Sequence, residues 1–268
     1  MGRLNKALER IKNDEVAYGR KGKQDPRRIY SPSGPVTDPI GQRLGRVTLD
    51  PDILYENHII TDDIDPVVHT SYKMLRTRIL QRMRANAWRT LAVTSATQGD
   101  GKSVSAINLA ISLAGDVNHN VCLVDLDLRH SSIAGYLGFQ PKYGISDCLQ
   151  KRATPEQTLL RTNIDRLVVM PNVRTIEHSS ELISSPAMYE LAAGLASDPD
   201  RIVIYDMPPL LAADDVLAFQ QIPDAILMVV AESVTKRTDS LKAAELLENL
   251  NVIGTVLNRS DERTASYY

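Results

Sequence analysis

Long apolar runs, cysteine and strong net charge are all scarce in this 268-residue sequence. No stretch approaches the ~20 apolar residues of a membrane-spanning helix and no signal peptide is evident, so we expect a cytoplasmic protein. Two cysteines, Cys122 and Cys148, do not make a disulfide framework, and Cys122 falls in an apolar run that predicts a buried strand. The net charge of −2 gives no global attraction to nucleic acid.

Charge is unevenly distributed along the chain. Residues 1–46 carry eleven Lys/Arg and five Asp/Glu, a balance of +6, which leaves −8 for the remainder. Apolar residues at helical spacing predict a short amphipathic helix over residues 1–12. Residues 13–53, rich in Pro, Gly, Ser and charge, predict a flexible basic linker. Such an arm suits an anionic membrane surface or an acidic partner, and a merely solvated tail explains the same composition.

Residues 54–260 alternate apolar runs with helical patterns. Asp65 and Pro66 provide a cap and a first residue for a helix over 67–85. The arginines of this helix form a cationic face, which is usually solvated and is also suited to contact with a neighbouring subunit. We expect further helices at 104–114, 186–195, 212–220 and 235–249, and strands at 91–93, 121–126, 167–170, 202–205, 225–230 and 253–257. Nearly all-apolar strands alternating with helices indicate an α/β fold, a three-layer parallel sheet with helices on both faces.

One loop has the composition of a phosphate-binding loop. The segment Gly-Asp-Gly-Lys-Ser at 99–103 lies between a predicted strand and a predicted helix. Backbone N–H groups at such a helix N-terminus bind anions, the lysine reaches phosphate oxygens and the serine hydroxyl binds Mg²⁺. The pattern Gly-x-x-x-x-Gly-Lys-Ser/Thr is met except that Ala96 replaces its first Gly. The residues expected to bind the nucleotide are Gln98, Gly99, Asp100, Gly101, Lys102, Ser103, Val104, Asn258 and Arg259.

Three carboxylates follow predicted strands, where ligands of open parallel sheets bind. Ser103, Asp125 and Asp206 are the candidate Mg²⁺ ligands, because Mg²⁺ takes one or two carboxylates and keeps most of its waters. Lys102, Asp125 and Asp127 are the candidate catalytic residues: one aspartate holds the metal while the other orients or deprotonates a nucleophile. Each acid alone is also consistent with a capping role.

Two further side chains near the ends of predicted strands each have two possible roles. Arg129 either stabilises phosphoryl charge or binds a neighbouring molecule. Asn258 offers a donor and an acceptor in one plane, which matches an adenine edge, and a turn-forming role is about as consistent.

Residues 94–103 resemble the deviant Walker A motif of the bacterial tyrosine kinases, the autokinases of capsule and exopolysaccharide export. Residues 123–129 and 203–209 are similar to their Walker A′ and Walker B motifs. The resemblance implies the P-loop NTPase fold and an ATP- and Mg²⁺-dependent protein-tyrosine kinase that phosphorylates C-terminal tyrosines in trans, here Tyr267 and Tyr268 in a tail over 261–268. It also implies a homo-oligomer and a separate membrane-anchored chain-length regulator as activator, which places the protein at the inner face of the membrane.

Two comparisons with related motifs bear on which branch of this superfamily the chain resembles and on its oligomerisation. Partitioning and septum-site ATPases, members of the same superfamily, carry a signature lysine where Thr97 or Gln98 stands here, which favours the kinases. Residues 70–76 keep the last arginine of the kinases' Glu-x-x-Arg-x-x-Arg oligomerisation motif and lack its glutamate. The rival functions are an ATPase switch that positions a partner without kinase activity, and a non-catalytic export scaffold.

Overall fold

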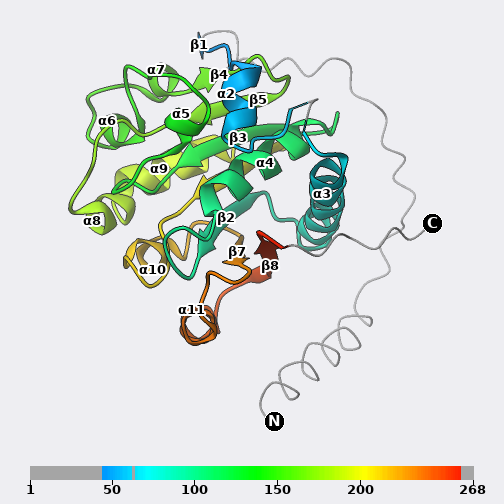
Figure 1. Cartoon of the computed structure of the whole chain (residues 1–268). Coiled ribbons are helices and arrows are strands. Elements are labelled where there is room, and N and C mark those ends of the chain that lie inside the picture. Colours follow the sequence, from blue (N-terminus) through cyan, green and yellow to red (C-terminus); the bar gives the residue numbers. More distant parts are fainter. Residues whose placement is uncertain (1–43, 62–63, 261–268) are drawn as a thin grey trace, which may run out of the picture. The chain divides into compact units, whose positions relative to one another are not determined.

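The computed structural model describes residues 44–61 and 64–260. In this part of the chain an eight-stranded sheet has the order β1-β4-β5-β3-β6-β2-β7-β8 (Figure 1). The strands are β1 (Gly45–Arg46), β2 (Thr90–Ser95), β3 (Asn120–Asp125), β4 (Leu160–Arg161), β5 (Leu167–Met170), β6 (Arg201–Asp206), β7 (Ala225–Ala231) and β8 (Val252–Asn258). The helices are α2 (Pro51–Glu56), α3 (Pro66–Asn86), α4 (Lys102–Ala114), α5 (Ile133–Tyr136), α6 (Ile145–Leu149), α7 (Pro155–Thr158), α8 (Ser179–Ile183), α9 (Pro186–Leu195), α10 (Asp215–Phe219) and α11 (Arg237–Leu246).

The centre of the sheet is parallel, as predicted. From β5 through β3, β6, β2 and β7 to β8, every neighbouring pair is parallel. The far edge differs from the prediction: β4 runs antiparallel to β5, and β1 is parallel to β4. Both β1 and β4 are only two residues long. Strands this short carry too little apolar pattern to be read from sequence.

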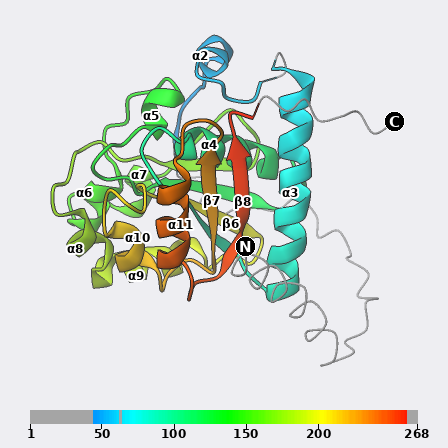
Figure 2. The same ribbon diagram turned by 60° about the horizontal axis from the view of Figure 1, so that its bottom comes forward.

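Two apolar clusters, one on each face of the sheet, confirm the three-layer fold. One contains buried residues of α2, α3, α4 and α5, and the other contains buried residues of α6, α9, α10 and α11. Figure 1 shows α4 and α9 on opposite faces, and Figure 2 shows α3 and α11 flanking β7 and β8. The strands β2 and β6 are buried along their whole length, because helices cover both of their faces.

Residues 44–53, predicted as linker, belong to the folded domain. Here β1 pairs with β4, Leu49 is buried, and Asp50 caps α2 by accepting a hydrogen bond from Asp52 N. The predicted helix over 1–12, the rest of the linker and the tail 261–268 lie outside the described residues. No helix in the described ranges is both long enough and apolar enough to cross a membrane.

The helix α3 packs through arginines as well as apolar side chains. Its buried residues, Ile79, Leu80 and Met83, lie in its second half. Arg76 Nη1 donates to the Ser112 carbonyl at 2.8 Å, and Arg82 Nη1 donates to the Ile253 carbonyl of β8. Part of the face predicted to be solvated therefore docks α3 onto α4 and onto the edge of the sheet.

Candidate functional site

The predicted phosphate loop connects β2 to α4. Gly99 and Gly101 both have φ of +87°, a left-handed conformation that favours glycine, and Gly101 is the N-cap of α4. A Cβ at Gly101 would lie 2.0 Å from Asn258 Nδ2, so glycine is required there for space as well. Ala96 is not among the residues with positive φ, which explains why alanine is accommodated where the motif has its first glycine.

The strand order brings the three predicted carboxylates together around Lys102. Asp125 and Asp206 are register partners on the neighbouring strands β3 and β6, and β6 lies beside β2. Lys102 Nζ lies 2.7 Å from Asp127 Oδ2 and 3.6 Å from Asp206 Oδ1. It also donates to Ser103 Oγ at 3.2 Å. A buried ammonium therefore faces a set of buried carboxylates at the carboxyl edge of the sheet.

The two aspartates that follow β3 have different surroundings. Asp125 Oδ2 accepts hydrogen bonds from the backbone N–H groups of Ser132 and Ile133, each at 3.2 Å, at the start of α5. Asp127 Oδ1 accepts from His130 N at 3.0 Å, while its other oxygen meets Lys102. Asp125 is thus the deeper carboxylate, and Asp127 is the one paired with the lysine.

Burial shifts the ionisation of this cluster. Burial, strengthened by the Asp206 carboxylate, raises the pKa of Asp125 well above its usual value. Burial also raises the pKa of Asp206, an effect that the Lys102 ammonium partly offsets. Burial alone would lower the pKa of Lys102, but the attraction of Asp206 and Asp127 outweighs it and raises that pKa. The lysine therefore stays charged, and the raised pKa values of the two aspartates reflect the cost of ionising them here, a cost that a bound cation would offset.

The oxygen donors fit a magnesium ion. In the described ranges, Asp125 Oδ1 and both oxygens of Asp206 are buried without a hydrogen-bond partner. Buried polar atoms without partners are rare and costly, and carboxylate and hydroxyl oxygens are the ligands Mg²⁺ takes. No group of three or more His, Cys, Asp or Glu residues in the described chain is placed to hold a metal ion by itself. A bound Mg²⁺ would therefore take most of its ligands from phosphates and water, as Mg²⁺ commonly does.

Asn258 and Arg259 contact the loop itself. Asn258 Nδ2 donates to the Asp100 carbonyl at 2.9 Å, and Arg259 Nη2 donates to the Gly99 carbonyl at 3.0 Å. The end of β8 therefore braces the phosphate loop, a contact that no sequence pattern predicts because it joins residues about 160 apart. Asp100, one of the residues expected to bind the nucleotide, has its side chain fully buried within the protein, whereas Gln98 and Gly99 are exposed.

Arg129 belongs to a polar cluster next to the carboxylates. Its Nε donates to Ser179 Oγ at 2.9 Å, and that hydroxyl lies 2.8 Å from both oxygens of Asp215, so its single proton is donated to the carboxylate. Ser179 and Asp215 are fully buried. No sequence signal marks these two residues, because they follow no strand and only the fold brings α8 and α10 together.

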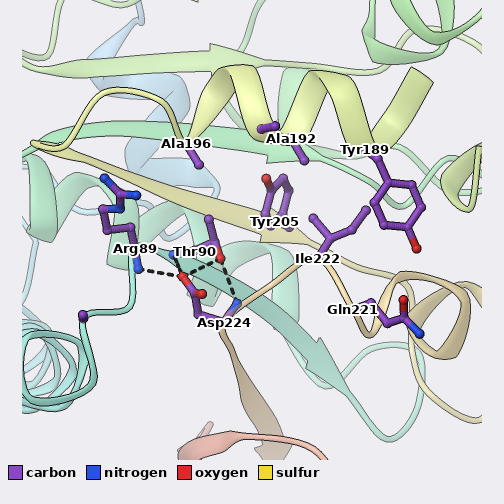
Figure 3. A pocket seen from close by; sticks show the side chains of 11 residues that line it. Arg89, Thr90, Tyr189, Ala192, Ala196, Tyr205, Gln221, Ile222 and Asp224 are labelled. Atoms are coloured by element: carbon purple, nitrogen blue, oxygen red, sulfur yellow. Dashed lines mark hydrogen bonds between the residues drawn. The ribbon is translucent and has the colours of Figure 1, made fainter. Parts of the chain in front are cut away.

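A pocket of about 280 Å³ lies where the parallel strands of the sheet begin, at the opposite end from the phosphate loop (Figure 3). Its lining includes Thr90 and Asp224, where β2 and β7 begin, together with Ala192 and Ala196 of α9. Asp224 Oδ2 accepts from the backbone N–H groups of Arg89 and Thr90 and from the Thr90 hydroxyl. This pocket is separate from the phosphate loop, because the loop follows the other end of β2.

Comparisons with known proteins agree with this fold and site. The ParA family model, described as the NUBPL iron-transfer P-loop NTPase, matches residues 86–265. The tyrosine-protein kinase YwqD of Bacillus subtilis (strain 168) is 30% identical over 189 residues, 70% of this chain and 79% of that protein. The succinoglycan biosynthesis transport protein ExoP of Rhizobium meliloti (strain 1021) is 28% identical over 193 residues, 70% of this chain and 24% of that protein. The crystal structure of the chimerical protein CapA2B2 superposes with a TM-score of 0.70 at 25% identity, covering 81% of this chain and 93% of that one.

The fold, the loop and the family model define a P-loop NTPase of the ParA type. Within that class the chain belongs to the bacterial tyrosine kinases. The fold class and the family predicted from the sequence motifs are thereby confirmed.

Proposed function

We propose that this protein transfers the γ-phosphoryl group of ATP to tyrosine hydroxyls in a Mg²⁺-dependent reaction. The observation that carries the proposal is the position of the Lys102 ammonium, at the start of α4 and within 3.6 Å of two aspartates. The loop amides and Lys102 bind the phosphates, and Ser103 with Asp206 and Asp125 would hold the metal. Bound Mg²⁺ neutralises charge on the β- and γ-phosphates.

Asp127 is assigned as the group that takes the tyrosine proton. Asp125 is the deeper of the two acids, with one oxygen held by two backbone amides, so it suits the metal role. In the transfer, the phenol oxygen bonds to the γ-phosphorus, the bond to the β–γ bridging oxygen breaks, ADP leaves, and the phenolic proton passes to Asp127. Lys102 is then paired with phosphate oxygens, which frees the Asp127 oxygen that it contacts at 2.7 Å.

The acceptors proposed are Tyr267 and Tyr268 of a second copy, phosphorylated in trans within a homo-oligomer. The process proposed is regulation of exopolysaccharide or capsule polymerisation and export, in line with relatives named as tyrosine kinases and as a succinoglycan biosynthesis transport protein. The activator proposed is a membrane-anchored chain-length regulator that holds the kinase at the inner membrane face. The basic N-terminal arm is the candidate contact. A variant that starts at Leu44, which keeps β1 and Leu49 of the folded domain, should lose association with that regulator.

Incubation with γ-labelled ATP tests the kinase proposal. We expect label on tyrosine, removed by the Tyr267→Phe/Tyr268→Phe double change and absent in Lys102→Met. Label found only as free phosphate would instead show an ATPase switch, and no turnover would indicate a scaffold. Mass-spectrometric mapping of phosphotyrosine on protein isolated from its own cells, where the activator is present, distinguishes a scaffold from a kinase that requires its activator.

A further inference from the structure

Asp100 places a negative charge inside the loop that has to bind phosphate. The residue lies between Gly99 and Gly101, and its side chain is fully buried. Glycines with φ of +87° on either side leave this part of the loop many alternative conformations. A carboxylate that turned toward the phosphates would repel them, so its orientation decides whether the loop accepts an anion.

Two threonines hydrogen-bond this carboxylate. Thr97 donates its backbone N–H to Asp100 Oδ2 at 2.9 Å, and its hydroxyl also lies within 3.2 Å of both carboxylate oxygens. The Thr235 hydroxyl donates to Asp100 Oδ1 at 2.8 Å from 135 residues away in sequence. No Lys or Arg of the described ranges forms an ion pair with Asp100. The hydroxyl and amide donors thus hold the carboxylate.

Thr235 has a fixed donor direction. Its Oγ1 accepts a hydrogen bond from Ala231 N at 2.8 Å, and Thr235 N donates to the Ala231 carbonyl at 3.0 Å. A hydroxyl has one proton, and here that proton is directed at Asp100 because the oxygen already accepts from an amide. Ala231 ends β7, which pairs with β2, the strand that leads into the loop.

We propose that Thr235 is a positioning residue for the phosphate loop: through Asp100 it fixes the loop in the shape that binds nucleotide phosphates. The proposal rests on the nucleotide-dependent function proposed above. Without the contact, the binding-competent loop is only one of several conformations, and apparent affinity falls in proportion to its population. Turnover of nucleotide that is already bound changes little, because Thr235 reaches no reacting atom.

The test measures binding of a fluorescent ADP analogue with Mg²⁺ to the full chain, together with KM for ATP and kcat. Thr235→Val keeps the shape and removes the hydroxyl, and we expect about ten-fold weaker binding and a matching rise in KM, with kcat within about three-fold. Thr235→Ser retains the hydroxyl and should bind within about two-fold of the wild type.

Thr162→Val is the matched control. Thr162 is a buried threonine between β4 and β5 whose hydroxyl accepts from Ile164 N at 3.1 Å and lies 3.1 Å from the Leu167 carbonyl oxygen. Its loss should lower stability and leave nucleotide affinity unchanged. Equal weakening by the Thr162 and Thr235 changes would indicate general destabilisation and overturn the proposal.

A double-mutant cycle tests whether Thr235 affects nucleotide affinity through Asp100. In an Asp100→Ala background, Thr235→Val should change affinity by less than about two-fold, because both residues act through one contact. A full ten-fold loss in that background, or wild-type affinity in Thr235→Val alone, would overturn the proposal and leave the kinase function standing. Failure of the wild type to bind the analogue would instead refute the nucleotide function itself.

Discussion

Asp125→Asn should make the nucleotide-free protein more stable and the enzyme inactive. Asn keeps the carbonyl oxygen that accepts from Ser132 N and Ile133 N. It replaces Asp125 Oδ1, which has no hydrogen-bond partner, with an amide donor beside Asp206 of the neighbouring strand. The oxygens of Asp206 also accept no hydrogen bond in the described chain, although Oδ1 lies 3.6 Å from Lys102 Nζ. The change therefore removes a buried like-charge interaction and supplies a hydrogen-bond donor.

The sign and pH dependence follow from the raised pKa of Asp125, which burial and the Asp206 carboxylate push well above the unfolded value of 3.8. A group whose pKa rises on folding stabilises the fold fully below its unfolded pKa, and this stabilisation is lost as pH rises through the folded pKa. The magnitude is that of giving a buried polar atom without a partner, Asp125 Oδ1, a hydrogen-bonding role. We expect Asp125→Asn to raise the free energy of unfolding by about 1–3 kcal/mol at pH 7, with the gain shrinking toward pH 4. Each kcal/mol corresponds to a rise in Tm of about 2–4 °C.

The assay is thermal and urea unfolding from pH 4 to 8, with a chelator and without nucleotide. Asp147→Asn is the control, because its expected effect on the free energy of unfolding has the opposite sign. Burial would raise the pKa of Asp147, but hydrogen bonds from Gly144 N, Arg152 and Arg174 outweigh it and lower that pKa. Its stabilisation exists above the unfolded pKa and is lost as pH falls through the folded pKa, so Asp147→Asn should cost about 1–2 kcal/mol at pH 7. Destabilisation by Asp125→Asn at pH 7, or a gain independent of pH, would refute the reasoning.

The remaining predictions concern the loop and the core. Lys102→Met should lower tyrosine phosphorylation by about 100-fold or more, measured with labelled ATP, because a charge acting on the transferring phosphoryl group is lost. Gly101→Ala should weaken ADP binding far more than Gly99→Ala in fluorescence titrations: both have φ of +87°, but only the Gly101 Cβ meets Asn258, at 2.0 Å. Equal effects would show that the clash is unimportant. Tyr205→Phe should raise stability by about 1 kcal/mol in urea unfolding, since its buried hydroxyl has no partner in the described chain, and a loss would contradict this.

The central sheet and the phosphate loop were predictable because their signals are local. Apolar runs of three to seven residues gave the strands around the loop. Asp65 with Pro66 gave the start of α3, whose cap accepts a hydrogen bond from Val67 N. Carboxylates that follow parallel strands must share one edge of the sheet, which brought Asp125, Asp127 and Asp206 near Lys102 without any knowledge of strand order.

The contacts that brace the loop were not predictable, because they join residues far apart in sequence. Nothing in the segment around Thr235 marks it as a partner of Asp100, since a threonine after a strand is common and the contact spans 135 residues. The short strands β1 and β4 were missed for a related reason: two residues carry no period, and tertiary pairing alone defines them. The arginines of α3 illustrate the same limit, since their carbonyl partners lie on α4 and β8.

The strand order also has a consequence for how the chain folds. The three adjacent strands at the centre, β3, β6 and β2, come from residues 120–125, 201–206 and 90–95, so β6 inserts between two segments made much earlier in the chain. Pairings of such high sequence separation form late and slowly. A refolding molecule therefore acquires its ligand-binding edge only when this insertion is complete, so a fluorescent nucleotide added during refolding should report the last step of assembly.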